Sequence, residues 1–397
     1  MVNKTDQEIM RANNTNLVLQ ELFNSRQTSR IEIAKQLNLH KSTISSIYQD
    51  LFEFGYIEEL GQGEATKSGG RRPELIRFNK DMGYVIGFDL GGRNIRYTIA
   101  NLKGNVIFSG KQAIKSKKAK KIVEQFIDLI NEIRSREDLP ETKYGLLGMA
   151  IGIHGIIVNR KITYSPFISD LENFDLVKEI NEKIKKPIIL ENEANMTAVF
   201  VRDYHDYPQK YHYSNLLSVN IRSGIGAGMI IFDQLQRGDF GVAGEIGRMV
   251  IDVSDNTPKR LEDLTSEDAV IEQIKEIKKQ SNVQLEQLVD WYQNGDAKVV
   301  ALMDDWAMLI ATAIYNLSTV SAPQAVFINS RILAMLPELF EKLTQRFDSL
   351  HHASLQPPKV YLVSNSIKTA NQLGGVAQII RLLLGLPNEK LHFYESE

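Results

Sequence analysis

The chain has 397 residues, a formal net charge of -2 and no cysteine. This length predicts two or three domains, and the near-neutral charge restricts any nucleic-acid contact to a local basic patch. The lack of cysteine excludes disulfides, thiolate nucleophiles and cysteine-ligated zinc. No apolar run approaches the roughly 18 residues of a membrane-spanning helix, and the first residues lack a signal-peptide core, so we expect a soluble cytoplasmic protein.

The first eighty residues predict a small helical unit. Apolar residues recur at helical spacing over residues 14–23, and Asn24 ends that pattern. Either Thr28 or Ser29 can cap a second helix, and residues 38–39 form the turn after it. The residues of this second helix expected to face inward are Ile31, Ile33, Ala34 and Leu37.

A third helix opens near Lys41 and carries two distinct faces. The residues expected to be buried are Ile44, Ile47, Leu51 and Phe54. The other face carries short or hydrogen-bonding side chains that can enter the major groove of DNA, and Lys41 can contact a phosphate. The residues expected to contact DNA are Lys41, Ser42, Thr43, Ser45, Ser46, Tyr48 and Gln49. The alternative is a helical hairpin whose polar face meets only solvent.

A basic hairpin follows these helices. Strand patterns at residues 55–60 and 74–79 flank the glycine-rich stretch GQGEATKSGGRRP, which contains Arg71 and Arg72. A flexible basic tip directly after a helix-turn-helix is what a winged helix uses to reach backbone phosphates or the minor groove. We therefore predict a winged helix-turn-helix domain for double-stranded DNA over residues 1–80, with both arginines in contact with DNA.

From Tyr84 onward strands alternate with helices, which predicts an α/β body. The β-type runs lie at residues 84–91, 94–108, 144–155, 187–194, 216–232 and 324–329, and residues 119–134 are helical in pattern. We expect a first lobe over residues 83–190 and a second over residues 191–397, with the C-terminal helix returning to the first lobe. The lysine-rich segment 111–121 is interpreted as a solvated loop and helix start rather than a nucleic-acid patch.

Two glycine-rich turns follow strands of this body. Gly91 and Gly92 come after Asp89, and Gly224 and Gly226 lie in the stretch RSGIGAG. Glycine after a strand often only makes a tight turn. Two such turns in successive lobes nevertheless predict a cleft in which backbone amides of both lobes face a phosphate.

Two polar clusters are assigned to the same cleft. Asn192 and Glu193 follow the strand PIIL, and ligand groups of open α/β sheets usually lie at such strand ends. Glu245 and Arg248 are three residues apart, so a helical turn puts them on one face, where a surface ion pair is the simpler alternative. Convergent carboxylates and amides without an evident set of metal ligands suit a polyol, since each hydroxyl needs donors and acceptors.

Together these motifs resemble the ROK family, named for repressors, open reading frames and sugar kinases. The resemblance covers essentially the whole chain and rests on GQG...SGGRRP, DLGG, IGIHGII, ENEAN, SGIGAGMII and GVAGEIG. It points to the DNA-binding branch of xylose and N-acetylglucosamine repressors, and IGIHGII with ENEAN is most similar to the xylose repressors. The resemblance implies a winged helix-turn-helix domain joined to a two-lobed, sugar-kinase-like body of the actin-like ATPase type, which binds sugar between its lobes.

The resemblance also assigns the residues of the sugar site. The positions implied to meet sugar hydroxyls are Asn192, Glu193, Glu245 and Glu262, with Arg248 placed in the same site. Arg248 stands where the family has a zinc-binding histidine, and the three zinc cysteines of the family are missing, so we expect no structural zinc. Phe167 stands where the sugar-contacting loop often has asparagine, which removes one expected hydroxyl contact.

A sugar kinase needs a general base, a cradle for Mg-ATP and an adenosine pocket, and the resemblance implies that all three are altered. The catalytic aspartate of the family is Glu193 here, and a displacement on the order of 1 Å can lower a rate about a hundredfold. Arg93 replaces a phosphate-binding threonine and is expected to fill the vacated space, and VFINSRI replaces a glycine-rich adenosine turn. The residues interpreted as degenerate phosphate motifs are Asp89, Gly91, Gly92, Gly224 and Gly226.

We therefore expect a transcriptional repressor, homodimeric or homotetrameric, that leaves its operator DNA when a sugar binds, with xylose as the first candidate. It is expected to need no cofactor and no metal, and to have no membrane partner. Two alternatives stay open. One is an ATP-dependent sugar kinase with an accessory DNA-binding domain. The other is an orphan regulator without a sugar effector, whose cleft is closed by Arg93, Phe167 and Arg248.

Overall fold

The computed structural model describes residues 6–63, 72–204, 213–252, 257–352, 354, 356–363 and 369–393. Contacts divide the chain into two compact units. Unit 1 comprises Met1–Gly155, Arg160–Glu191 and Gln372–Glu397, and unit 2 comprises Ile156–Asn159 and Asn192–Asn371. Among the helices of the described residues, none has both the length and the apolar character that crossing a membrane requires.

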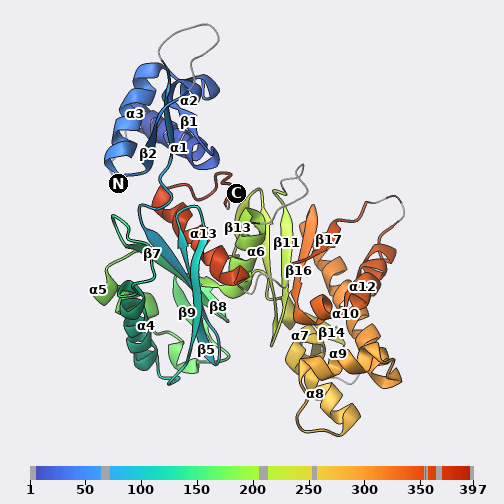
Figure 1. Cartoon of the computed structure of the whole chain (residues 1–397). Helices are drawn as coiled ribbons and strands as arrows, with labels where there is room; N and C mark the ends of the chain where they lie inside the picture. Colours follow the sequence, from blue (N-terminus) through green and yellow to red (C-terminus); the bar gives the residue numbers. More distant parts are fainter. Residues whose placement is uncertain are drawn as a thin grey trace. The chain divides into compact units, whose positions relative to one another are not determined.

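Unit 1 begins with three helices and a three-stranded sheet, which we call the N-terminal module (residues 6–79; Figure 1). Its elements are α1 (Asp6–Asn24), β1 (Thr28–Ser29), α2 (Arg30–Gln36), α3 (Lys41–Glu53), β2 (Ile57–Gln62) and β3 (Glu74–Phe78). The strands are antiparallel in the order β1-β3-β2. Of the two candidate caps, Ser29 is the one used, because its side chain accepts a hydrogen bond from the Glu32 backbone N–H.

Burial in the N-terminal module departs from the sequence-based expectation at two apolar residues. Ile31 is 54% exposed and Phe54 is 66% exposed, although helical spacing predicts burial for both. Ile31 lies in the first turn of α2, and Phe54 is the C-terminal cap of α3, so neither is within a helix interior. Helix α1 also starts at Asp6, earlier than its apolar pattern indicates. The pattern does not mark this start because the first turns of the helix are polar and largely exposed.

The rest of unit 1 is built on a five-stranded sheet in the order β10-β7-β4-β5-β6. Its strands are β4 (Tyr84–Leu90), β5 (Asn94–Asn101), β6 (Val106–Ala113), β7 (Leu146–Ile153) and β10 (Ile188–Asn192), the last of which ends at the unit boundary. Strands β4, β5 and β6 are antiparallel neighbours, whereas β4 and β7 are parallel. The lysine-rich segment is thus partly strand, since β6 continues to Ala113.

Helices cover both faces of this sheet. Phe126 of α4 (Ala119–Arg134) packs edge-on against Phe88 of β4, with ring centroids 5.2 Å apart. On the neighbouring residue Gly87, a Cβ would collide with the carbonyl oxygen of Gln372 in α13 (Ala370–Leu384). Because successive strand residues point to opposite faces, α4 and α13 lie on opposite sides of the sheet. Helix α5 (Leu176–Ile184) lies beside α4.

Unit 2 contains a second five-stranded sheet in the order β13-β12-β11-β16-β17. Its strands are β11 (Leu216–Ile221), β12 (Ile225–Ile231), β13 (Gln234–Gln236), β16 (Ala325–Ser330) and β17 (Lys359–Leu362). Helix α6 (Glu193–Tyr204) packs on β11 and β12, and the apolar core of unit 2 includes the long helix α10 (Ala297–Ser321). The other elements of the chain are β8 (Ile156–Val158), β9 (Lys161–Tyr164), η1 (Ser169–Leu171), η2 (Ile246–Arg248), β14 (Val250–Asp252), β15 (Lys259–Arg260), α7 (Leu261–Thr265), α8 (Glu267–Lys278), α9 (Leu285–Gln293), α11 (Arg331–Met335) and α12 (Pro337–Ser349).

The two sheets share one topology. In each, three antiparallel strands that are consecutive in the sequence are followed by two strands added on the side of the first. The first is β4 in unit 1 and β11 in unit 2, and each pairs in parallel with its neighbour from the added strands. The two glycine-rich turns occupy equivalent places, because they are the β4–β5 and β11–β12 connections. The body is therefore a duplicated mixed α/β fold.

A buried lysine attaches the N-terminal module to the rest of unit 1. Lys103 lies between β5 and β6, is 3% exposed, and donates hydrogen bonds from Nζ to the carbonyl oxygens of Phe23 (2.6 Å) and His392 (2.8 Å). The Asn24 side chain binds the same C-terminal segment, donating to the Lys390 carbonyl and accepting from the His392 N–H. The segment 390–393 is thus held between α1 and the body of unit 1.

Candidate functional site

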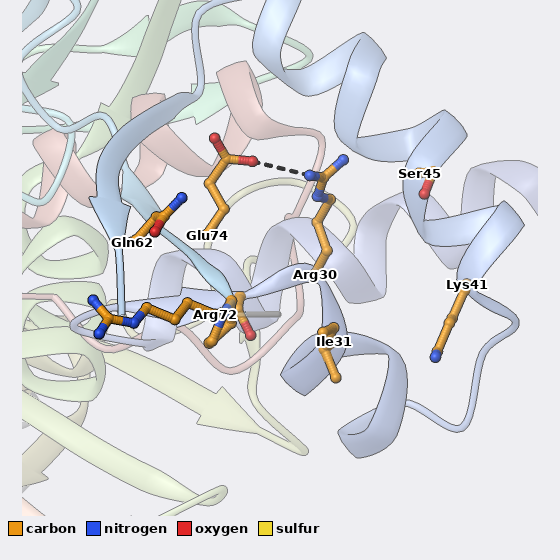
Figure 2. A pocket seen from close by; sticks show the side chains of 9 residues that line it. Arg30, Ile31, Lys41, Ser45, Gln62, Arg72 and Glu74 are labelled. Carbon is orange, nitrogen blue, oxygen red and sulfur yellow. Dashed lines mark hydrogen bonds and ion pairs between the residues drawn. The ribbon is translucent and has the colours of Figure 1, made fainter. Parts of the chain in front are cut away.

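A cation-lined hollow of about 320 Å³ lies in the N-terminal module between α2, the start of α3 and the β2–β3 hairpin (Figure 2). Its lining residues are Ser29, Arg30, Ile31, Lys41, Ser45, Gln62, Arg72, Pro73 and Glu74. The hollow brings together Lys41, Ser45 and Arg72 of the residues predicted to contact DNA. Arg71, the other arginine of that prediction, lies outside the described residues.

Arg30 is a cation of this hollow that sequence reasoning missed. Its Nη2 atom is 2.9 Å from Glu74 Oε2, and its guanidinium lies 4.6 Å from the centroid of the Tyr48 ring. The ion pair with Glu74 joins Arg30 to β3 of the hairpin (Figure 2), and the contact with Tyr48 joins it to α3. Its one sequence signal is its place directly after the capping residue Ser29, at the start of a helix.

The expectation that Tyr48 lies on the exposed face of α3 is wrong. Tyr48 is 7% exposed, stacks on Phe52 with centroids 5.9 Å apart, and donates a hydrogen bond from its hydroxyl to Glu59. Burial, with the Glu59 carboxylate beside it, raises the pKa of the Tyr48 hydroxyl. Tyr48 is four residues after the buried Ile44, which places it at the edge of the buried face.

The remaining DNA candidates keep an accessible position on α3. Ser42, Ser46 and Gln49 are exposed, and Thr43 is half-buried. Gln49 donates a hydrogen bond to Glu53 at 2.8 Å, one turn further along the same surface. A helix surface of serine, threonine and glutamine offers both donors and acceptors, which is the chemistry that base edges require.

A second cluster of polar residues lies in unit 2 at the junction of β10 and α6. Asn192 ends the strand, and its Oδ1 atom accepts from the backbone N–H groups of Ala194 (2.8 Å) and Asn195 (3.2 Å). This side chain therefore caps α6. Glu193 is the first residue of α6, so its side chain extends from the junction between the strand and the helix.

Glu245, Arg248 and Glu262 belong to the same cluster. The Ala227 N–H of β12 donates to the Gly244 carbonyl at 2.8 Å, which places Glu245 beside the sheet. Arg248 Nε lies 3.5 Å from Glu245 Oε2 across one turn of η2. The Glu262 carboxylate comes from α7, and its Oε2 atom would be 2.8 Å from a Cβ on Gly247 and 3.5 Å from one on Gly224.

The charges of two other carboxylates act on Glu245. Burial raises the pKa of Glu245, Arg248 opposes this, and the negative charges of Glu193 and Glu262 raise the pKa further. We call Glu193, Glu245, Glu262 and Arg248 the carboxylate cluster. Its oxygens can accept hydrogen bonds from several hydroxyl groups and its guanidinium can donate, which is the pattern that a polyol requires.

This cluster does not fit the structural zinc that the family resemblance implies. The chain contains no cysteine, and Arg248, at the place of the histidine ligand, is paired with Glu245. A guanidinium has no lone pair to give to a metal at neutral pH.

The glycine turn of unit 1 is occupied by protein side chains. Asp89 is 3% exposed, with Oδ2 3.0 Å from Arg96 Nη1 and Oδ1 3.0 Å from His154 Nε2. Burial raises the pKa of Asp89, but His154 and then Arg96 outweigh it, so the pKa lies below its usual value. Neither partner was identified from the sequence, because Arg96 pairs across the hairpin and His154 is 65 residues away.

Phe167, rather than Arg93, covers this turn. A Cβ on Gly92 would lie 3.0 Å from Phe167 Cγ, and the Phe167 ring is 5.6 Å from that of His154. Arg93 is exposed, so the expectation that it fills the vacated space is wrong. The turn itself is closed by the Gly91 N–H, which donates to the Asn94 carbonyl at 3.1 Å.

Gly226 of the second glycine-rich stretch has a packing role. A Cβ on Gly226 would lie 3.2 Å from the Ala194 Cβ, because α6 lies directly on β12. Gly224 accepts at its carbonyl from the Arg222 N–H at 2.9 Å, and the Arg222 side chain donates to Asn329 at the end of β16. Helix α11 then starts directly after β16, capped by Ser330. VFINSRI thus forms a strand and a helix start.

A model of the ROK family matches residues 85–381. The chain is 36% identical to the xylose repressor of Lactiplantibacillus pentosus over 98% of this chain and 97% of that protein, and 31% identical to the xylose repressor of Staphylococcus xylosus over 96% and 97%. A ROK family transcriptional regulator, a homologue of the E. coli MLC protein, superposes with a TM-score of 0.80 at 18% identity, covering 95% of this chain and 98% of that one. A ROK family glucokinase from Streptomyces griseus, in complex with glucose and AMPPNP, gives a TM-score of 0.62 at 18% identity over 76% of this chain and 100% of that one. The last two likenesses show a fold that regulators and kinases share.

Proposed function

The chain belongs to the ROK family, and on that premise we propose that it is a DNA-binding transcriptional repressor that a sugar releases from its operator. Xylose or a related sugar is the proposed effector, because the relatives that match nearly the whole chain are named xylose repressors. The observation that carries the proposal is that this chain has both a cation-lined hollow and a separate carboxylate cluster.

We assign DNA binding to a winged helix-turn-helix domain over residues 1–80. The order of α1, α2, α3 and the β2–β3 hairpin supports this, with α3 as the helix for the major groove and the hairpin as the wing. Lys41, Arg71 and Arg72 contact phosphates in this proposal, and Ser42, Thr43, Ser45, Ser46 and Gln49 face base edges. A homodimer or homotetramer would present two such helices to the half-sites of a palindrome.

We assign sugar binding to Asn192 and the carboxylate cluster. The two lobes of the proposed body are residues 83–190 and 191–397, with the C-terminal helix returning to the first lobe. The sugar must bind the state of low DNA affinity more tightly, and the shift in operator affinity cannot exceed that difference in sugar affinity.

Kinase activity is not part of the proposal. Asp89 is held by Arg96 and His154, and Phe167 covers Gly92, so the side chains of this chain occupy the turn that would meet a nucleotide phosphate. The protein can be incubated with ATP, magnesium and each of a panel of sugars. Turnover of ATP that is lost in Glu193→Ala would replace this proposal with the sugar-kinase alternative.

The test begins with a ligand screen on the full chain. D-Xylose, other pentoses, hexoses and N-acetylhexosamines are compared by thermal shift, because a ligand of the folded state raises the melting temperature by mass action. Duplexes selected from a random pool then serve in gel-shift titrations with and without the best sugar. We expect xylose to raise the melting temperature and to weaken DNA binding.

Glu193→Gln should abolish the response to sugar, whereas the exposed α8 control Glu276→Gln should keep it. No thermal response to any sugar, with DNA binding intact, would favour the orphan regulator instead.

A further inference from the structure

A second cavity lies in unit 1, and none of its lining residues is among those assigned above. Its volume is about 460 Å³, and its lining residues are Arg160, Val177, Asn181, Lys185, Lys186, Pro187 and Ile188. Three of these seven side chains are cationic and none is acidic. The cavity is formed by one face of α5, the loop that leads into β10 with the first residue of that strand, and the residue that precedes β9.

The three cations have no acidic partner within the part of the chain that the structure describes. Arg160, Lys185 and Lys186 make no ion pair and no side-chain hydrogen bond there. Other cations of the body are neutralised, for example Arg202 by Asp203 and Arg331 by Glu267. Like charges gathered without a counter-charge repel one another, and a bound anion would relieve this repulsion.

Two of these cationic residues have an unusual backbone conformation. Arg160 has φ 65° and Lys185 has φ 52°, both in the left-handed region that residues with a side chain rarely adopt. Lys185 is the C-cap of α5, and its N–H donates to the Asn181 carbonyl. Residues held in such conformations cluster at binding sites, because the surrounding structure must over-determine them.

The chemistry of the lining identifies the ligand class. A guanidinium fork, two ammonium groups and the Asn181 amide supply several N–H donors, which match the oxygens of a phosphoryl group. Val177, Pro187 and Ile188 supply an apolar wall beside them, and the volume falls in the range of small-molecule sites. We propose that this cavity binds a phosphoryl anion, either inorganic phosphate or a small phosphate monoester. The site is independent of the sugar proposal.

The test measures binding of inorganic phosphate and of glycerol 3-phosphate to the full chain, by calorimetry and thermal shift, against sodium chloride at equal ionic strength. The background is Arg30→Ala/Lys41→Ala, so that the hollow of the N-terminal module does not contribute. We expect saturable binding and a rise in melting temperature of about 2 °C at saturating anion.

Two triple variants, each lacking three positive charges, distinguish a specific anion site from general charge screening. Arg160→Ala/Lys185→Ala/Lys186→Ala removes the lining cations, and we expect it to weaken binding at least tenfold. Lys161→Ala/Lys178→Ala/Lys183→Ala removes exposed lysines of β9 and α5 that do not line the cavity, and should leave binding unchanged. Equal losses in both, or no preference for phosphate over chloride, would overturn the proposal.

Two further arms distinguish other sources of phosphate. Binding of the lining-cation variant to duplex DNA, and to vesicles of neutral and anionic lipid, should equal that of the background protein. A selective loss of DNA or vesicle binding, with binding of the small anions unchanged, would reassign the cavity to that partner and contradict the small-anion proposal.

Discussion

Lys103 Nζ donates a hydrogen bond to the Phe23 carbonyl oxygen at 2.6 Å, and so joins the last turn of α1 to the first sheet. The Phe23 ring completes the contact, since it lies 4.2 Å from the same ammonium and packs against Phe393. The proposed DNA-binding domain is therefore attached to the body through a buried charged group, and not only through the chain between them.

Lys103→Met should loosen this attachment. The substitution keeps the length of the side chain but leaves the Phe23 and His392 carbonyls without this donor, which costs about 1–3 kcal/mol of unfolding free energy. Hydrogen exchange should rise in α1 and in residues 390–393. The control Lys111→Met changes an exposed lysine of β6 and should leave exchange unaltered, and equal exchange in both variants would contradict the role of Lys103.

Arg72→Ala and Lys41→Ala should each weaken binding to all duplexes to a similar extent. If each side chain neutralises one phosphate, the slope of log affinity against log salt falls in magnitude by about 0.9 per variant. Gel shifts over a range of salt concentrations measure this slope. Lys120→Ala removes an exposed charge from α4 and should not change it. An unchanged slope in both test variants would remove the hollow from the DNA interface.

Tyr48→Phe should affect stability and not base selection. The variant loses the hydrogen bond to Glu59, worth about 1 kcal/mol, while the buried ring keeps its packing. Gln49→Ala, at the next and exposed position, should instead alter the sequences selected from a random duplex pool. Urea unfolding and selection on both variants measure the two effects. A changed preference in Tyr48→Phe would return Tyr48 to the DNA interface.

Glu245→Gln should stabilise the protein at neutral pH and abolish its response to sugar. The pKa of Glu245 is raised by burial and by Glu193 and Glu262, so its contribution to stability is fully present below the ordinary value of 4.5 and is lost as the pH rises through the raised folded pKa. The variant should match the wild type at low pH and exceed it at pH 7. Urea unfolding across this range measures the difference, and a variant less stable at pH 7 would show that the carboxylates do not repel one another.

Asp89→Asn should have the opposite pH dependence. The pKa of Asp89 is lowered by His154 and Arg96, so its stabilisation is present above the ordinary value of 3.8 and is lost as the pH falls through the lower folded pKa. The variant should lose about 1–3 kcal/mol of unfolding free energy at pH 7, with the difference shrinking in acid. Asp128→Asn, an exposed change in α4, is the control. A loss of equal size at every pH would point to packing instead of charge.

The elements that could be predicted from the sequence are those with a local cause. The cap at Ser29, the opening of α3 at Lys41 and the end of α1 at Asn24 all depend on residues within one or two turns. The strands beside both glycine turns were likewise marked by their own apolar runs. Local pattern is sufficient wherever the deciding contact lies within the same segment.

The residues that pattern could not place are decided by partners far along the chain. Arg30 and Glu59 are the partners of Tyr48, and Asp89 is neutralised by His154. Phe167 takes the place expected for Arg93 at the first turn, since which side chain fills a space depends on the path of a distant loop. Helical or strand periodicity carries no information about such pairs.

The contact between Gly87 and Gln372 makes the sheet of unit 1 depend on the last helix of the chain. During synthesis its five strands leave the ribosome long before α13, so one face of the sheet stays uncovered while unit 2 is made. Lys103 must also wait for His392. Unit 2, by contrast, is complete once residue 371 has emerged. The contacts that join the N-terminal module to residues 390–393 can therefore form only after unit 2 has been synthesised.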